Sequence, residues 1–142
     1  MSEPLVSIDF LVGDTKVDAG HAAITQAAAE FQRLVDAKAP RGDIVSSFAR
    51  LRDLIVHHFP SEELLLRRLE ADPANADHVR RHRAHHRTLA DSFTYAFDKI
   101  AATKATEPLP AIVTLIPKKY IDEMLSVDME MAELLRTVNN DR

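Results

Sequence analysis

The amino-acid sequence predicts an all-α protein folded as an up-down-up-down four-helix bundle. Its long segments carry apolar residues three and four positions apart, which gives an α-helix one apolar face. Proline and glycine occur at a few positions and divide the chain into four such segments. No segment shows the sustained alternation of apolar and polar residues that predicts a strand. Because short loops join the four segments, an antiparallel bundle is the natural arrangement.

The first two segments predict the first pair of helices. Asp18 can cap a helix over residues 19–38, whose alanines and straight-chain side chains favour helix, and Pro40 ends it. Asp43 can cap the second helix, which continues to Pro73. The apolar face of this second helix consists of Phe48, Leu51, Leu54, Ile55 and Phe59.

The second half of the chain predicts the other two helices, over about residues 74–102 and 110–139. The first 17 residues are too short for a domain, and we expect them to pack across the bundle as an arm. The sequence therefore predicts one domain over residues 1–142, with the arm at 1–17 and the bundle at 18–139.

Composition and charge exclude several classes of function. With 18 Lys and Arg against 22 Asp and Glu, the net charge is −4, whereas general nucleic-acid binders are usually basic. There is no cysteine, so thiolate metal sites and cysteine nucleophiles are excluded. Three glycines cannot form a glycine-rich phosphate loop. No basic, apolar leader and no run of about 18 apolar residues is seen, so we expect a cytoplasmic protein without a membrane partner.

Histidines and carboxylates recur at helical spacing on successive predicted helices. His58 and Glu62 are four residues apart, and so are His82 and His86, so the members of each pair project from one helix face. His78 lies one turn before His82, so a second pairing is open, His78 with His82. Inward-facing imidazoles and carboxylates on separate helices are how a four-helix bundle holds two metal ions. Nitrogen and oxygen donors of this kind suit iron, with zinc, manganese or copper as competitors.

The sequence resembles the hemerythrin family, which comprises non-haem di-iron proteins built on a four-helix bundle. VDAGHAAI resembles the family's first-helix pattern, Ile-Asp-x-x-His-x-x-Leu, and places His21 at a ligand position. HHFPSEELLL resembles the His-Phe-x-x-Glu-Glu pattern and places His58 and Glu62, while HRAHHRTL resembles His-x-x-x-His and places His82 and His86. The three patterns occur in the family's order and cover most of the chain.

The fourth predicted helix departs from the family, which carries Trp-Leu-x-x-His-Ile and an Asp five residues after the His. No histidine follows His86 in this chain. Matching the apolar residues puts Met124 at the His position, whereas matching the spacing of five puts Glu123 there and Asp128 at the Asp position. Asp128 fits both registers, as four beyond Met124 or five beyond Glu123, and Glu123 fits one. Asp128 and Glu123 are therefore both candidate ligands.

The resemblance implies a hemerythrin-like bundle that binds two non-haem iron ions (Fe2+/Fe3+), bridged by an oxo or hydroxo group. It implies dioxygen as the partner molecule, carried, stored or sensed, and thus a metal- and oxygen-binding protein rather than an enzyme. The departure in the fourth helix leaves two alternatives open. One is a related protein that reduces O2 or handles iron, and the other is a degenerate bundle that acts as a sensory or interaction module.

Overall fold

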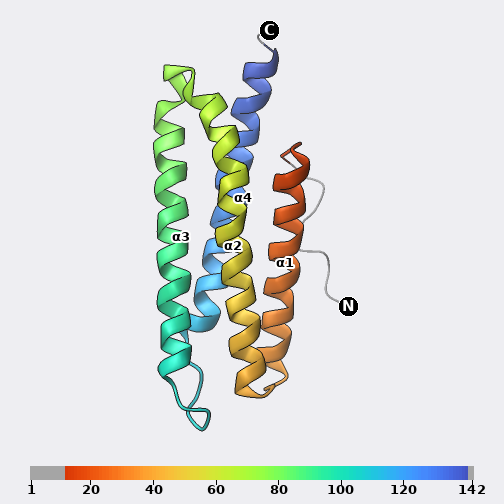
Figure 1. Ribbon diagram of the computed structural model, residues 1–142, viewed down its shortest axis with the longest axis vertical. Coiled ribbons are helices and arrows are strands. Elements are labelled where there is room, and N and C mark those ends of the chain that lie inside the picture. The colour runs from red at the N-terminus through yellow and green to blue at the C-terminus, as the bar shows by residue number, and fades with distance from the viewer. Residues whose placement is uncertain (1–11, 141–142) are drawn as a thin grey trace.

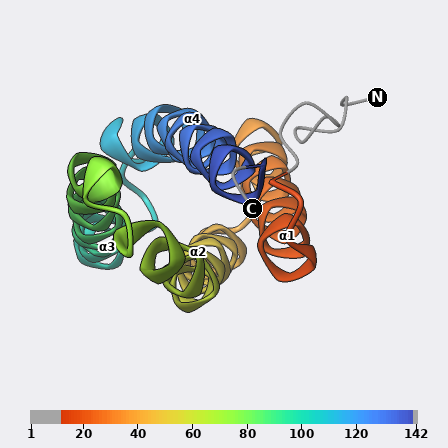
Figure 2. The ribbon, with the colours of Figure 1, turned by 90° about the horizontal axis from the view of Figure 1, so that it is seen from above.

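In the computed structural model, which describes residues 12–140, the chain forms four long α-helices and one short 3-10 turn (Figure 1). The helices are α1 (Thr15–Asp36), α2 (Arg41–Glu70), α3 (Ala76–Ala102) and α4 (Ile112–Asn140), and the 3-10 turn η2 (Pro73–Asn75) precedes α3. Consecutive helices run in opposite directions and surround a common interior (Figures 1 and 2). No strand occurs in the described part of the chain. The predicted all-α, up-down-up-down bundle is therefore confirmed.

The helix starts differ from the predicted ones by a few residues. The N-cap of α1 is Asp14, whose carboxylate accepts hydrogen bonds from the backbone N–H groups of Lys16 and Val17. Asp18 does not cap the helix, because its carboxylate accepts from backbone N–H groups that precede the helix, at Val12 and Gly13. Similarly, α2 starts before Asp43, with Pro40 as its N-cap residue.

The helix ends follow the sequence pattern more closely. The second helix ends at Glu70, and Asp72 then caps η2, as expected from the Asp-Pro step at this point. Pro60 and Pro117 lie inside α2 and α4, which continue past them. The predicted arm at 1–17 falls mostly outside the described residues, which begin at Val12.

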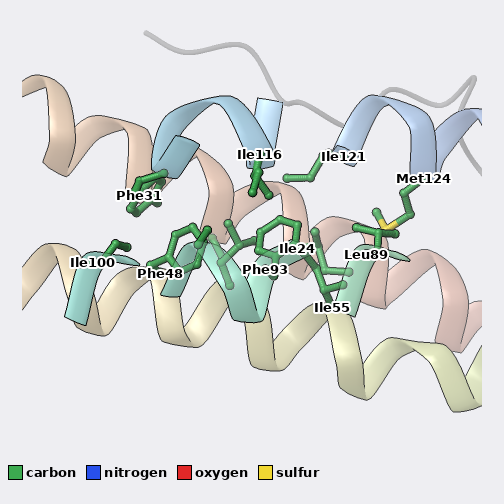
Figure 3. Packing of buried hydrophobic residues seen from close by; sticks show 14 of the residues in the cluster. Ile24, Phe31, Phe48, Ile55, Leu89, Phe93, Ile100, Ile116, Ile121 and Met124 are labelled. Carbon is green, nitrogen blue, oxygen red and sulfur yellow. The ribbon is translucent and has the colours of Figure 1, made fainter. Parts of the chain in front are cut away.

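Apolar side chains fill the bundle in two separate clusters. The large apolar cluster includes Phe31, Phe48 and Phe93, whose rings pack together (Figure 3). Figure 3 also shows members from all four helices, including Ile24, Ile55, Leu89 and Met124. The small apolar cluster comprises Val17, Leu65, Leu66, Leu69, Val79, Met131 and Leu135. No helix among residues 12–140 combines the length and the hydropathy needed to span a membrane.

Candidate metal centre

Six ionisable side chains from all four helices are buried in the interior of the bundle. We call them the polar cluster, and none is more than 7% exposed. Its members are His21 on α1, His58 and Glu62 on α2, His82 and His86 on α3, and Asp128 on α4. Ionisable groups are rarely buried this deeply unless they are paired or bind a metal.

The polar cluster lies between the two apolar clusters along the bundle. On α1, His21 lies between Val17 of the small apolar cluster and Ile24 of the large one. On α4, Asp128 lies between Met131 and Met124 in the same way. The members on α2 and α3 are likewise flanked, by Ile55 and Leu65 and by Val79 and Leu89. The 3.6-residue helical repeat therefore aligns one polar layer between two apolar layers.

The polar cluster divides into two overlapping groups that share Glu62 and Asp128. One group adds His21 and His58, and the other adds His82 and His86. In each group, one potential ligand atom from every residue lies within 4.8 Å of the others. Each group could hold one metal ion, and the two groups share two carboxylates, as in the two-metal sites of four-helix bundles.

The two carboxylates are placed so that each contacts both groups. Asp128 Oδ2 lies 2.6 Å from His21 Nε2, and its Oδ1 lies 2.9 Å from His82 Nε2. Glu62 Oε2 lies 3.1 Å from His86 Nε2 and 3.6 Å from His58 Nε2. Because each carboxylate faces one histidine of either group, both would be available as ligands to an ion in either group.

Five buried atoms of the polar cluster have no aligned hydrogen-bond partner among the described residues. These atoms are His21 Nδ1, His58 Nε2, His82 Nε2, Glu62 Oε1 and Asp128 Oδ1. Two of them, His82 Nε2 and Asp128 Oδ1, are still 2.9 Å apart as an ion pair. A buried polar atom without a partner costs about 1–3 kcal/mol. The last four are atoms of the kind that bind metals, and bound cations would satisfy them together. The residues present therefore fit a metal centre.

Burial sets the protonation of two of the histidines. Burial, together with the charge of His21, lowers the pKa of His58 to about 4. Burial and the charge of His82 lower the pKa of His86 to about 4. Because a metal binds the neutral imidazole, both rings are in the metal-binding protonation state at neutral pH.

The remaining members are coupled through Asp128. Burial alone would raise the pKa of Asp128, but contacts with Glu62 and two histidines hold it well below its usual range. Burial likewise opposes the charge of His82, but contacts with Asp128 and Glu62 outweigh this effect and raise the pKa of His82 to about 9. The pKa of Glu62 is raised well above its usual range, mainly by burial and then by Asp128. In the metal-free protein, the raised pKa values of Glu62 and His82 favour protons on these two side chains. A bound cation would take the place of these protons.

Local features of α1 and α2 hold two of the imidazoles in place. The ring of His58 lies against the backbone of Gly20, where an added Cβ would be 2.1 Å from His58 Nδ1. Only glycine leaves room for this ring. The ring of His86 stacks on Phe59, with ring centroids 4.1 Å apart. Both imidazoles are therefore fixed by packing as well as by polar contacts.

The structure brings six of the seven predicted ligands together and leaves Glu123 outside. The side chain of Glu123 is 46% exposed, and its Oε2 lies 3.7 Å from Nε2 of His85. Met124 is fully buried in the large apolar cluster, one turn before Asp128. The separation of five residues rotates Glu123 about 140° around α4 from Asp128, whereas four residues rotate Met124 by only about 40°. No side chain of α4 therefore supplies the family's histidine.

Of the two pairings left open on α3, the structure places His82 and His86 in one group and leaves His78 outside both groups. The contacts of the buried His78 ring with His82 and with Glu130 were not foreseen from the sequence. The close packing of Gly20 on His58 was also missed, although an isolated glycine inside a helical pattern is a usable signal of close contact. His57, in contrast, is exposed and bonds to the backbone of Asp53, outside the polar cluster.

The fold and the polar cluster together define a helical bundle of the cation-binding class. The family described as Hemerythrin HHE cation binding domain matches residues 12–135. The chain therefore belongs to the hemerythrin HHE cation-binding family. No significant match was found among curated proteins or among solved structures.

Proposed function

We propose that the protein is a non-haem di-iron protein that binds dioxygen. The observation that carries this proposal is the pair of four-residue groups that share Glu62 and Asp128. Membership of a cation-binding family supports it independently. When bound, iron would supply the oxygen-binding and redox chemistry that protein side chains lack.

The chain's own residues would serve as ligands and as a water-excluding shell. His21 and His58 would hold one ion, and His82 and His86 the other. Imidazole nitrogen with carboxylate oxygen is a donor set that suits iron. The two apolar clusters lie on either side of the polar cluster, and such a shell limits access of water and tunes the redox behaviour of a metal site.

Iron content and oxygen reactivity test this proposal. We would reconstitute the metal-free protein with Fe(II) without oxygen, count iron per chain, then admit O2 and record near-ultraviolet and visible absorption. We expect about two iron ions per chain and a new absorption that reverses when O2 is removed. Iron content near zero would contradict the proposal. His57→Ala is the matched control, because His57 lies outside the polar cluster and should leave the iron content unchanged.

The donor count favours reduction of O2 as a second candidate function. Each group offers two imidazoles and two carboxylates, close to the two-histidine, one-carboxylate set with open positions that is typical of non-haem Fe(II) oxygenases. No histidine of α4 adds to either group. An oxygen electrode with a peroxide assay distinguishes the two functions. Reversible uptake supports oxygen binding, whereas irreversible consumption with oxidation of the iron supports reduction.

A further inference from the structure

His78 extends the histidines of α3 by one turn beyond the polar cluster. It is 3% exposed, although neither metal-binding group includes it. Its Nε2 lies 3.0 Å from Nδ1 of His82 in a hydrogen bond, and the two rings meet edge to face. His78 therefore contacts the ring nitrogen of His82 that faces away from Asp128 and Glu62.

A carboxylate of α4 lies on the far side of His78. Glu130 Oε1 is 3.1 Å from His78 Nδ1, and the same oxygen is 2.9 Å from the guanidinium of Arg81. Arg81 thus tethers Glu130 at the edge of the bundle, next to the buried imidazole. Glu130, His78 and His82 form a continuous series from the surface to the polar cluster.

Metal binding at His82 Nε2 would determine which atoms donate and which accept hydrogen bonds between His82, His78 and Glu130. This step rests on the function proposed above. If Nε2 binds a metal, the ring proton must be on Nδ1, and His82 must donate it. The acceptor within reach is His78 Nε2, so the proton of a neutral His78 must be on Nδ1. That nitrogen faces Glu130. The opposite tautomers would direct a proton from His82 Nε2 toward the metal.

We propose that His78 and Glu130 are positioning residues for the metal centre, which hold the His82 ring and tautomer so that Nε2 is free to bind the ion. His78 accepts the hydrogen bond of His82 Nδ1–H, and the Glu130 carboxylate, 3.1 Å from His78 Nδ1, attracts the proton on that nitrogen. A carboxylate at the end of such a series makes the ligand imidazole more basic and hence a stronger ligand. Among the other candidate ligand imidazoles, His21 lacks this support, since its Nδ1 has no hydrogen-bond partner among the described residues.

Cobalt binding by four variants tests the proposal. Co(II) alone is titrated into metal-free protein, and its content, its affinity in competition with a chelator and its visible spectrum are measured. His78→Leu fills the space but removes the acceptor, and His78→Gln restores an acceptor. Glu130→Gln removes the terminal charge at a partly exposed position. Glu133→Gln is the matched control, because it makes the same change on the same helix at an exposed residue whose carboxylate pairs with Arg136.

We expect His78→Leu to weaken Co(II) binding roughly 10- to 100-fold and to alter the cobalt spectrum. His78→Gln should recover most of the affinity, and Glu130→Gln should show a smaller loss, with the melting temperature of the metal-free protein unchanged. Glu133→Gln should bind as the wild type does. This pattern separates positioning from a structural role, which would lower the melting temperature of the metal-free Glu130→Gln variant.

Two results would overturn the proposal without affecting the di-iron function. One is wild-type affinity and spectrum in both His78→Leu and Glu130→Gln. The other is a loss in His78→Gln as large as that in His78→Leu. If His78→Leu fails to fold, Glu130→Gln and Glu133→Gln decide between the outcomes. Wild-type protein that binds no Co(II), in contrast, would overturn the metal site itself and this inference with it.

Discussion

At the scale of single residues, the packing of the polar cluster involves Gly20 as well as the candidate ligands. Glycine inside a helix costs roughly 0.5–1 kcal/mol relative to alanine. Here it leaves the space that the ring of His58 occupies. The sequence presents Gly20 as an ordinary neighbour of His21. It cannot show that a ring from another helix packs there, because this contact depends on how α1 and α2 approach each other.

Gly20→Ala should weaken metal binding without unfolding the protein. The added Cβ would lie 2.1 Å from His58 Nδ1, so the ring must move away from its position beside Glu62. The better helix propensity of alanine should offset part of the cost in the metal-free state. We expect metal affinity to fall at least several-fold, measured by competition with a chelator.

Gly42→Ala is the matched control for this change. Among the described residues, no atom beyond its chain neighbours and the adjacent backbone of its own helix lies within 4 Å of the position where its Cβ would be. Its metal affinity should equal that of the wild type. Equal affinity in Gly20→Ala as well would show that the position of His58 against Gly20 does not matter for metal binding.

At the scale of helices, spacing predicted which candidate ligands on one helix lie together. His58 with Glu62, and His82 with His86, were both placed by a separation of four residues, and the structure brings both pairs into the polar cluster. The choice between His78 and His86 could not be made from spacing, because both are one turn from His82. It depends on which turn of α3 lies opposite Glu62, and His86 is the one that contacts this carboxylate.

The register of α4 is the other feature that spacing left open. Asp128 is 1% exposed and lies within the polar cluster, whereas Glu123 is on the outer face. The helix starts show a similar limit, because Asp14 and Asp18 can each accept bonds from nearby backbone N–H groups, and both do. The local sequence is compatible with either register of α4 and either N-cap of α1. The packing between the helices determines which one is adopted.

Asp128→Asn should therefore lower metal affinity by more than about 10-fold, because it removes a charge shared by both groups. Glu123→Gln should leave the affinity close to that of the wild type, because this side chain lies outside both groups. Thermal melting with and without metal provides a second measurement, since metal binding is coupled to folding. A larger loss in Glu123→Gln than in Asp128→Asn would favour the register in which Glu123 takes the family's histidine position.

At the scale of the whole molecule, one buried polar layer divides the interior of the bundle. The two apolar clusters stabilise the fold on either side, so the bundle does not depend on the metal for its entire core. The composition and the helical pattern were sufficient to predict this bundle. The sequence motifs predicted the polar residues of each helix separately. They could not predict the polar layer as a whole, because it forms only when the four helices align along the bundle axis.

The stability of the metal-free protein should fall as the pH rises from 6.5 to 9. The pKa of His82 is about 9 in the folded state, against an ordinary value of 6.5, so the folded protein binds the proton more tightly than the unfolded chain. This stabilisation is complete below pH 6.5 and is lost as the pH rises through 9. At about 1.4 kcal/mol per pKa unit, His82 alone would contribute roughly 3 kcal/mol.

Thermal melting across this pH range provides the measurement. Metal-loaded protein should lack the decline, because the cation replaces the protons, and metal affinity should rise with pH over the same interval. His57→Gln, at an exposed histidine, should keep the wild-type decline. A melting temperature of the metal-free protein that is constant or rises between pH 6.5 and 9 would contradict the coupling of His82 to Asp128.

The number of metal ions per chain in variants of each group tests the central claim most directly. Native mass spectrometry with Co(II) can count them in wild type, His58→Ala, His86→Ala and Glu62→Gln. We expect about two ions in the wild type, about one in each histidine variant, and a loss at both positions in Glu62→Gln, because Glu62 is shared. One ion or none in the wild type, or equal losses in His58→Ala and the exposed-site control His57→Ala, would contradict a shared two-metal centre.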